Sequence, residues 1–210
     1  MTRSMTTRPL FVTPLYEATL SGDKDFETFI DDLHDACIAV AEEDEAGQAW
    51  AEKKGYLGYT SYASLDDLPQ RDSLFADLKK KLDRHALAFA KDLRFDLAGG
   101  KLVMDSFWIN ILDPGGQHTG HIHPHSVISG TVYVTIPAGA SALKFEDPRL
   151  PMMMAAPTRD EHAPEPLRPF VYVQPQPGTI LMWESWLRHE VTLNQAEEQR
   201  ISISFNYAWR

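Results

Sequence analysis

Apolar residues recur at helical spacing in two stretches of the first hundred residues. From Asp23 to about Ala46, and again from about Leu68 to Leu93, an apolar side chain follows every three or four positions. Pro69 stands near the beginning of the second stretch, where the first turn of a helix tolerates proline. The pattern therefore predicts two amphipathic helices, separated by a turn that is rich in glycine and tyrosine.

After Gly100 the pattern changes to short runs of apolar and β-branched residues that alternate with polar ones, as in Ile201–Asn206. Turns rich in proline, glycine and aspartate separate these runs. Seven strands are predicted, over Leu102–Leu112, Ser126–Ile136, Ala142–Phe145, Phe170–Gln174, Thr179–Trp183, His189–Leu193 and Ile201–Trp209. So many short strands are typical of a sandwich, jelly roll or barrel.

One long segment between the predicted strands fits neither element. Residues Asp147–Pro169 contain six prolines and three consecutive methionines. Long loops of this kind frequently cover binding sites, so we consider this segment a candidate substrate lid.

Length and composition indicate one compact domain. A chain of 210 residues is long enough for one domain. We expect residues 1–100 to form a helical part that supports a β core over residues 101–210. With 43% hydrophobic and 24% charged residues, the chain is typical neither of disordered nor of membrane proteins. Residues 1–14 lack the apolar stretch of a signal peptide, so we expect a cytoplasmic protein. A single cysteine, Cys37, excludes an internal disulfide and a multi-cysteine zinc site.

The net charge of −10 is concentrated in one region. Eleven acidic residues and a single basic one, Lys24, lie between Glu17 and Trp50. No basic cluster suggests nucleic-acid binding, and no segment has the roughly 20 apolar residues of a membrane helix. We expect the acidic stretch to be the solvated face of the first helix, which leaves room for a homodimer contact.

The strongest chemical signal is a cluster of histidines. His118, His121, His123 and His125 fall within eight residues, and His189 follows in a different predicted strand. Residues two apart in a strand project from the same face, so His121 and His123 can face one ion. Imidazole suits iron, zinc, copper or nickel, and His189 could complete the set. The pattern predicts a metal site, in which the roles of His118 and His125 stay open.

A second signal lies in the last predicted strand. Arg200 and Ser202 share one face of that strand by the same alternation. A guanidinium beside a hydroxyl can hold a carboxylate through a fork and one further hydrogen bond. We therefore expect a carboxylate site near His189.

Together these residues resemble the Fe(II)/2-oxoglutarate-dependent oxygenases, and more narrowly a poorly characterised bacterial and phage branch of them. The resembling segments are His121–Ser126, Ser129–Val134, Gly178–Ser185, His189–Val191 and Arg200–Asn206, with Trp108–Asn110 and Phe11–Leu15 ahead of them. The resemblance implies a mainly β chain with N-terminal helices: a double-stranded β-helix of eight antiparallel strands, a cupin-like jelly roll with helices packed on one sheet.

The same resemblance implies an activity and a site. It implies Fe(II) bound by His121, His123 and His189, with no catalytic side chain beyond the metal centre. Arg200, Ser202 and Tyr133 would bind the distal carboxylate of 2-oxoglutarate. 2-Oxoglutarate would be decarboxylated to succinate and CO₂ while a primary substrate is hydroxylated. The sequence does not fix that substrate; the absence of a basic groove and of a membrane helix leads us to expect a small molecule or a peptide as partner, and no nucleic acid or membrane. Trp183 is expected in the core.

One departure from the superfamily keeps alternatives open. The common triad is His-x-Asp/Glu…His, but histidine stands at position 123. Either His123 is the third ligand, or a distant carboxylate such as Asp105 or Glu184 completes the site. An all-histidine set also occurs in cupin-type dioxygenases that do not use 2-oxoglutarate, and that enzyme is the first alternative. The second is a non-catalytic barrel that binds a metal or a small carboxylate.

Overall fold

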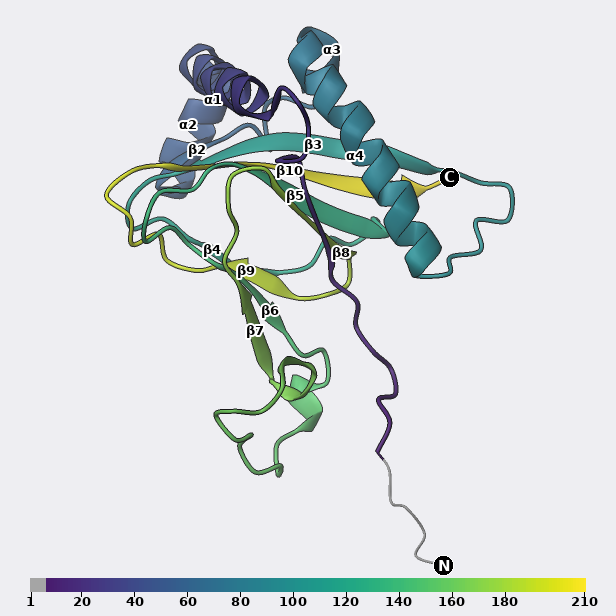
Figure 1. Ribbon diagram of the computed structural model, residues 1–210. Helices are drawn as coiled ribbons and strands as arrows, with labels where there is room; N and C mark the ends of the chain where they lie inside the picture. Colours follow the sequence, from purple (N-terminus) through teal and green to yellow (C-terminus); the bar gives the residue numbers. More distant parts are fainter. Residues whose placement is uncertain (1–6) are drawn as a thin grey trace, which may run out of the picture.

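Two antiparallel sheets face each other in the computed structural model, and helices cover the outer face of the larger one (Figure 1). The structure describes residues 7–210; the first six residues of the stretch inspected for a signal peptide lie outside the described residues. The larger sheet has the strand order β1-β8-β5-β10-β3-β2, and the smaller one has the order β4-β9-β6-β7. This is the expected double-stranded β-helix with helices on one sheet. It has ten strands within residues 7–210, where the resemblance implied eight.

The seven strands predicted from the sequence all form, with ends shifted by at most two residues. The strands are β1 (Tyr16–Thr19), β2 (Gly58–Thr60), β3 (Leu102–Leu112), β4 (His118–His121), β5 (Ile128–Thr135), β6 (Leu143–Glu146), β7 (Phe170–Val173), β8 (Thr179–Glu184), β9 (His189–Val191) and β10 (Arg200–Trp209). The sequence analysis missed β1, β2 and β4, since each is a short segment without a clear alternation of its own and forms by pairing with a neighbour: β1 with β8, β2 with β3 and β4 with β9.

Each predicted helix is divided in two by an aspartate. The first becomes α1 (Phe26–Glu43) and α2 (Glu45–Lys54), and the second becomes α3 (Leu68–Arg71) and α4 (Ser73–Asp92). Most of α2 lies beyond the predicted end of the first helix at about Ala46 and was missed. The break falls at Asp44 and at Asp72, whose carboxylates accept hydrogen bonds from the backbone N–H groups of Gly47 and Leu74. An aspartate that caps a new helix in this way competes with continuation of the old one.

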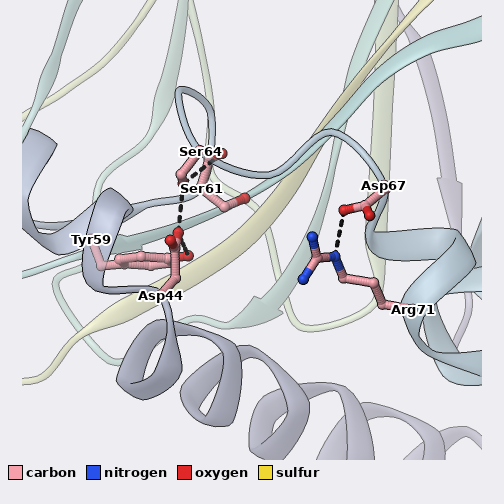
Figure 2. Close-up of polar contacts among 6 residues, drawn as sticks. All are labelled: Asp44, Tyr59, Ser61, Ser64, Asp67 and Arg71. Atoms are coloured by element: carbon pink, nitrogen blue, oxygen red, sulfur yellow. Dashed lines mark hydrogen bonds and ion pairs between the residues drawn. The ribbon is translucent and has the colours of Figure 1, made fainter.

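Asp44 also ties the helices to the larger sheet, as Figure 2 shows. Its Oδ2 accepts hydrogen bonds from the hydroxyls of Tyr59, on β2, and Ser64. These bonds favour the ionised carboxylate, so the pKa of Asp44 is lowered although burial alone would raise it. The contact fixes α2 beside β2. The exposed pair Asp67 and Arg71, also drawn in Figure 2, joins two residues of the α3 region.

Strand β10 separates two different interiors. Its apolar residues Ile201, Ile203 and Phe205 belong to the main core, which fills the space between the larger sheet and helices α1 and α4. Its alternating polar residues face the space between the two sheets. The period of two therefore gives the larger sheet an apolar face toward the helices and a polar lining toward the smaller sheet. That polar lining is where the candidate site lies.

The N-terminal hundred residues contribute more than supporting helices. Strands β1 and β2 form the two edges of the larger sheet, outside β8 and β3. The division of the chain at residue 100 stays a prediction. No helix within residues 7–210 combines the length and the apolar character that crossing a membrane requires.

Candidate metal and carboxylate site

A cavity of about 500 Å³ opens between the two sheets and contains all the residues of the predicted site. Strand β10 contributes Arg200, Ser202, Ser204 and Asn206 to its wall, and the smaller sheet together with the loop that follows β4 contributes the histidines. No residue of the loop 147–169 lines this cavity. Figure 1 shows that loop, in green, projecting from the ends of β6 and β7. The prediction that this loop is a substrate lid is therefore not supported.

Three histidines meet in this cavity. His121 ends β4 and lies opposite His189, the first residue of β9, while His123 follows two residues after β4 ends. The possible ligand nitrogens of these residues all lie within 4.8 Å of one another, and the Nε2 atoms of His123 and His189 are 3.3 Å apart. One ion could contact all three. The expectation that His121 and His123 share a strand is wrong in detail, because the strand ends first; the backbone N–H of His123 instead donates to the carbonyl of Ser185.

The surroundings of two of these rings fix which nitrogen faces the cavity. The Nδ1 of His121 lies 2.7 Å from the carbonyl oxygen of Thr119, and the Nδ1 of His189 lies 2.9 Å from that of Leu187. A carbonyl can only accept, so both rings carry their proton on Nδ1. The lone pairs of both Nε2 atoms are therefore directed into the cavity, as in metal-binding histidines.

Burial keeps the cluster in the form that binds metals. Desolvation lowers the pKa of His189 to about 3, with His121 and His123 adding smaller repulsions. The pKa of His123 is lowered to about 4 for the same reasons. At neutral pH these imidazoles are uncharged. Neither Asp105 nor Glu184 belongs to the cluster, so the geometry favours His123 as the third ligand over a distant carboxylate.

A buried cation without an acidic partner lies in the same cavity. Arg200 is only 1% exposed, and none of the ion pairs among residues 7–210 includes it. Its guanidinium donates to the hydroxyl of Ser202 at 3.2 Å and lies over the ring of Tyr133, 5.0 Å from the centroid. The Nε of Arg200 and the hydroxyl of Tyr133 are both buried without a hydrogen-bond partner.

These unpaired groups match a carboxylate. Burial lowers the pKa of Arg200, yet a guanidinium keeps its proton in proteins, so the charge stays uncompensated. Burial raises the pKa of Tyr133 to about 12, so its hydroxyl stays a donor. A carboxylate accepts from a guanidinium fork and from hydroxyls, and would satisfy both unpaired groups. The chain therefore offers an anion site in the cavity that contains the histidine cluster.

Three residues that line the cavity were missed by the sequence analysis or left without a role: Tyr56, His118 and His125. The hydroxyl of Tyr56 lies 2.6 Å from the Nε2 of His118, and both side chains line the cavity. Burial and the charge of Arg200 lower the pKa of His118 to about 3, so His118 is neutral and its Nε2 accepts a hydrogen bond from the Tyr56 hydroxyl. The sequence has no periodic signal for Tyr56, which lies between α2 and β2. His125 lines the cavity at a positive φ of 78° but does not join the metal cluster.

Trp183 has the structural position expected for it. It is 3% exposed in the small core between the sheets, and its ring contacts His189 edge to face at 4.6 Å between centroids. The indole packs one side of the His189 imidazole and thereby restricts its orientation.

Comparison with known proteins confirms the resemblance to the Fe(II)/2-oxoglutarate-dependent oxygenases. Residues 106–206 match a protein family described as "Putative 2OG-Fe(II) oxygenase". This segment includes the three histidines, Tyr133, Arg200 and Ser202. No curated protein matches the chain significantly.

Solved structures share the fold over nearly the whole chain. A prolyl-4-hydroxylase from Pseudomonas putida aligns with a TM-score of 0.61 and 15% identity over 93% of each chain. The epimerase SnoN, in complex with Fe³⁺, alpha ketoglutarate and nogalamycin RO, aligns with a TM-score of 0.62 and 12% identity over 93% of this chain and 79% of that one. A shorter alignment joins 52% of this chain to 46% of a 2OG-Fe(II) oxygenase family protein from Burkholderia pseudomallei, with 17% identity and a TM-score of 0.40. At 15% and 12% identity, the first two likenesses are of fold alone.

Proposed function

We propose that this chain, whose residues 106–206 match the 2OG-Fe(II) oxygenase family, is an Fe(II)- and 2-oxoglutarate-dependent oxygenase that hydroxylates a small molecule or a peptide. 2-Oxoglutarate would be converted to succinate and CO₂. The observation that carries the proposal is the pairing of two features in one cavity: a cluster of three histidines and a buried arginine without an anionic partner.

The three histidines would hold the metal. Their donor set, three imidazole nitrogens within 4.8 Å, suits a first-row divalent ion and leaves the rest of its coordination shell free. When bound, Fe(II) together with 2-oxoglutarate supplies the activation of O₂ for attack on a C–H bond. The chain's own contribution is orientation. Two backbone carbonyls hold the rings of His121 and His189, and Trp183 packs against His189.

Arg200, Ser202 and Tyr133 would hold 2-oxoglutarate by its distal carboxylate. The guanidinium supplies charge and a planar fork, and the two hydroxyls supply further hydrogen bonds. Because these groups are buried beneath the cavity, water competes poorly for the carboxylate. The complex of SnoN with Fe³⁺ and alpha ketoglutarate, which shares this fold, supports the assignment of the co-substrate.

The primary substrate would enter at the other side of the cavity. There the wall includes Trp108, whose indole contacts the exposed ring of Tyr62 edge to face at 5.2 Å between centroids. Asp105 is the acidic residue of the lining. An aromatic wall of this kind suits a compact organic group, as expected for a small molecule or a peptide side chain.

Turnover of the co-substrate tests the proposal. Purified protein is incubated with Fe(II), 2-oxoglutarate and O₂, alone and with pools of small molecules and peptides, while O₂ uptake and succinate are measured. We expect succinate and CO₂ in equal amounts, both lost when Fe(II) or 2-oxoglutarate is omitted and in His189→Ala. Binding of both ligands without turnover under any of these conditions would indicate a non-catalytic barrel instead.

The all-histidine cluster favours one other function, a cupin-type dioxygenase that does not use 2-oxoglutarate. That enzyme would consume O₂ in the absence of 2-oxoglutarate and would tolerate Arg200→Ala. The same assay therefore separates the two: O₂ uptake that is independent of 2-oxoglutarate and of Arg200 would support the cupin-type enzyme.

A further inference from the structure

The third histidine of the cluster has a different partner from the other two. His121 and His189 each face a backbone carbonyl two residues earlier, through Nδ1. The Nδ1 of His123 instead faces the side-chain amide of Asn206, on β10, with 3.4 Å between Nδ1 and Nδ2. A carbonyl can only accept, but an amide can donate or accept, depending on which of its two ends is presented.

In the orientation described, the amide favours a state in which His123 cannot bind a metal. The Nδ2 of Asn206 donates to the hydroxyl of Ser106 at 2.9 Å and points toward the Nδ1 of His123. His123 then carries its proton on Nε2, which lies 3.3 Å from the Nε2 of His189. Because His189 keeps its own proton on Nδ1, its Nε2 can accept this hydrogen bond. The proton on the Nε2 of His123 therefore lies between the two Nε2 atoms, where a metal ion would need the lone pairs of both.

The same amide has an unused acceptor. The Oδ1 of Asn206 is buried and has no hydrogen-bond partner. A half-turn of the amide brings Oδ1 to the place of Nδ2, where it can accept from the Nδ1–H of His123. The Ser106 hydroxyl, which donates to Oδ1 of Asp105 at 3.3 Å, would turn from that long bond to donate to Asn206. The imidazole exchanges its proton through water, losing it at Nε2 and gaining it at Nδ1, so no net proton is released. The Nε2 lone pair is then free for a metal.

We propose that Asn206 is the positioning residue of the third metal ligand, and that its amide turns over to hold the Nδ1-protonated form of His123 when a divalent ion binds. The inference rests on the proposed metal centre and adds a residue that acts through His123. It also explains how histidine can serve where the superfamily commonly has a carboxylate. A carboxylate needs no tautomer to be selected, whereas an imidazole in its place needs a partner at the opposite nitrogen.

The choice of an amide has an electrostatic consequence. Asparagine leaves His123 neutral, so the protein ligands do not reduce the positive charge of the metal ion. Only anionic co-ligands would reduce it. An aspartate at position 206 would draw the Nδ1 proton more strongly and pass negative character to the metal ligand. We therefore expect Asn206→Asp to bind a divalent ion at least as tightly as the natural chain does.

Cobalt(II) binding without turnover tests the proposal. Metal-free protein is titrated anaerobically with Co(II) by visible absorption. We expect a Kd about 10–100-fold weaker in Asn206→Ala, the usual effect of losing a partner of a metal-binding histidine. Asn206→Asp should restore binding. Asn110→Ala removes another buried asparagine of the same cavity, one that bonds to Thr60 and Ser204, and should leave the Kd within about twofold.

A second readout reports the tautomer directly. Nitrogen-15 NMR of histidine-labelled, Zn(II)-loaded protein should show His123 protonated at Nδ1, and this signal should be lost or broadened in Asn206→Ala. Thermal melting of the metal-free proteins shows whether each variant folds.

Three results would count against the account, and they differ in what they overturn. Equal Co(II) affinity in Asn206→Ala and the natural chain would overturn the role of Asn206 alone. Weaker binding in the alanine variant that Asn206→Asp does not restore would reduce Asn206 to a structural residue. Absence of Co(II) binding by the natural chain would overturn the metal centre itself, and with it the proposed function.

Discussion

Replacing Arg200 with methionine should make the ligand-free protein more stable and remove its response to 2-oxoglutarate. Arg200 is buried, and its guanidinium has one side-chain hydrogen bond, to Ser202, and no acidic partner among residues 7–210. Burying the Arg200 charge without an anion lowers the stability of the ligand-free protein. Methionine fills a similar volume without that charge.

The magnitude follows from the surroundings of the guanidinium. Burial of an unpaired ion costs several kcal/mol, and one hydrogen bond to a charged group returns about 1.5–3 kcal/mol. Contact with the Tyr133 ring adds about 2 kcal/mol at most. We therefore expect Arg200→Met to raise the free energy of unfolding by about 1–4 kcal/mol, the range found when buried charges are replaced by apolar residues.

The ligand response has a magnitude of its own. At 100 times its Kd, 2-oxoglutarate stabilises the natural chain by about 2.7 kcal/mol. For a chain of this length that corresponds to a rise in Tm of about 5–10 °C. Arg200→Met should show little or no rise, because the distal carboxylate loses the one arginine or lysine among residues 7–210 that lines the cavity.

Thermal melting of metal-loaded protein under anaerobic conditions, with and without 2-oxoglutarate, measures both effects. Succinate, which keeps the distal carboxylate but lacks the keto group, serves as a matched ligand. The reasoning is refuted if Arg200→Met shifts as much as the natural chain does. It is also refuted if the variant is several kcal/mol less stable without ligand, since Arg200 would then be a structural residue.

Three further substitutions test the fold around the site. A Cβ at Gly130 would lie 2.5 Å from the Phe205 ring and 2.7 Å from the Leu181 carbonyl, so Gly130→Ala should lower the free energy of unfolding in urea by about 1–3 kcal/mol. Asp44→Ala leaves the buried Tyr59 hydroxyl without its acceptor and should lower the free energy of unfolding by about 3 kcal/mol above pH 5. Because the pKa of Asp44 is lowered in the folded protein, this difference in stability should shrink as the pH falls below about 4. His118 has a pKa of about 3 in the folded protein and about 6.5 in the unfolded chain. It therefore makes the free energy of unfolding fall by about 1.4 kcal/mol per pH unit as the pH drops from 6.5 toward 3. His118→Gln should make this pH dependence less steep, and an unchanged slope would contradict the burial argument.

Elements with a clear period or with turn residues on both sides could be predicted from the sequence, and segments without either signal could not. β3 forms over the predicted Leu102–Leu112, where eleven residues of mainly apolar character mark the strand in the sequence, and it pairs with β10 along that length. β2 has three residues and begins at Gly58, whose φ of +122° and close approach to the Ile111 carbonyl depend on β3 being in place. Such pairing is a tertiary effect that local pattern does not contain.

The same distinction holds for the helices. The stripe of apolar residues correctly indicates helix before Asp44 and on both sides of Asp72, but it shows neither α2 nor where the chain turns. The turn depends on whether an aspartate caps the following helix, and a solvent-exposed aspartate in mid-helix has the same local sequence.

At the site, the chemistry-bearing residues were visible in the sequence while their partners were not. His121, His123, His189 and Arg200 stand out by residue type and spacing, and the structure brings all four to one cavity. Tyr56 and Asn206 lie 62 and 83 residues away from the histidines with which they interact. Their roles depend on which side chains meet across the cavity, which spacing along the chain cannot give.

One measurement tests the central claim most directly: anaerobic absorption spectroscopy of metal-free protein on addition of Fe(II) and then 2-oxoglutarate. Chelation of Fe(II) by 2-oxoglutarate produces a weak visible charge-transfer band. The account predicts this band in the natural chain and its loss in both His189→Ala and Arg200→Met. Binding of Fe(II) without the band, or a band that survives loss of Arg200, would contradict the assignment of this cavity to iron and 2-oxoglutarate.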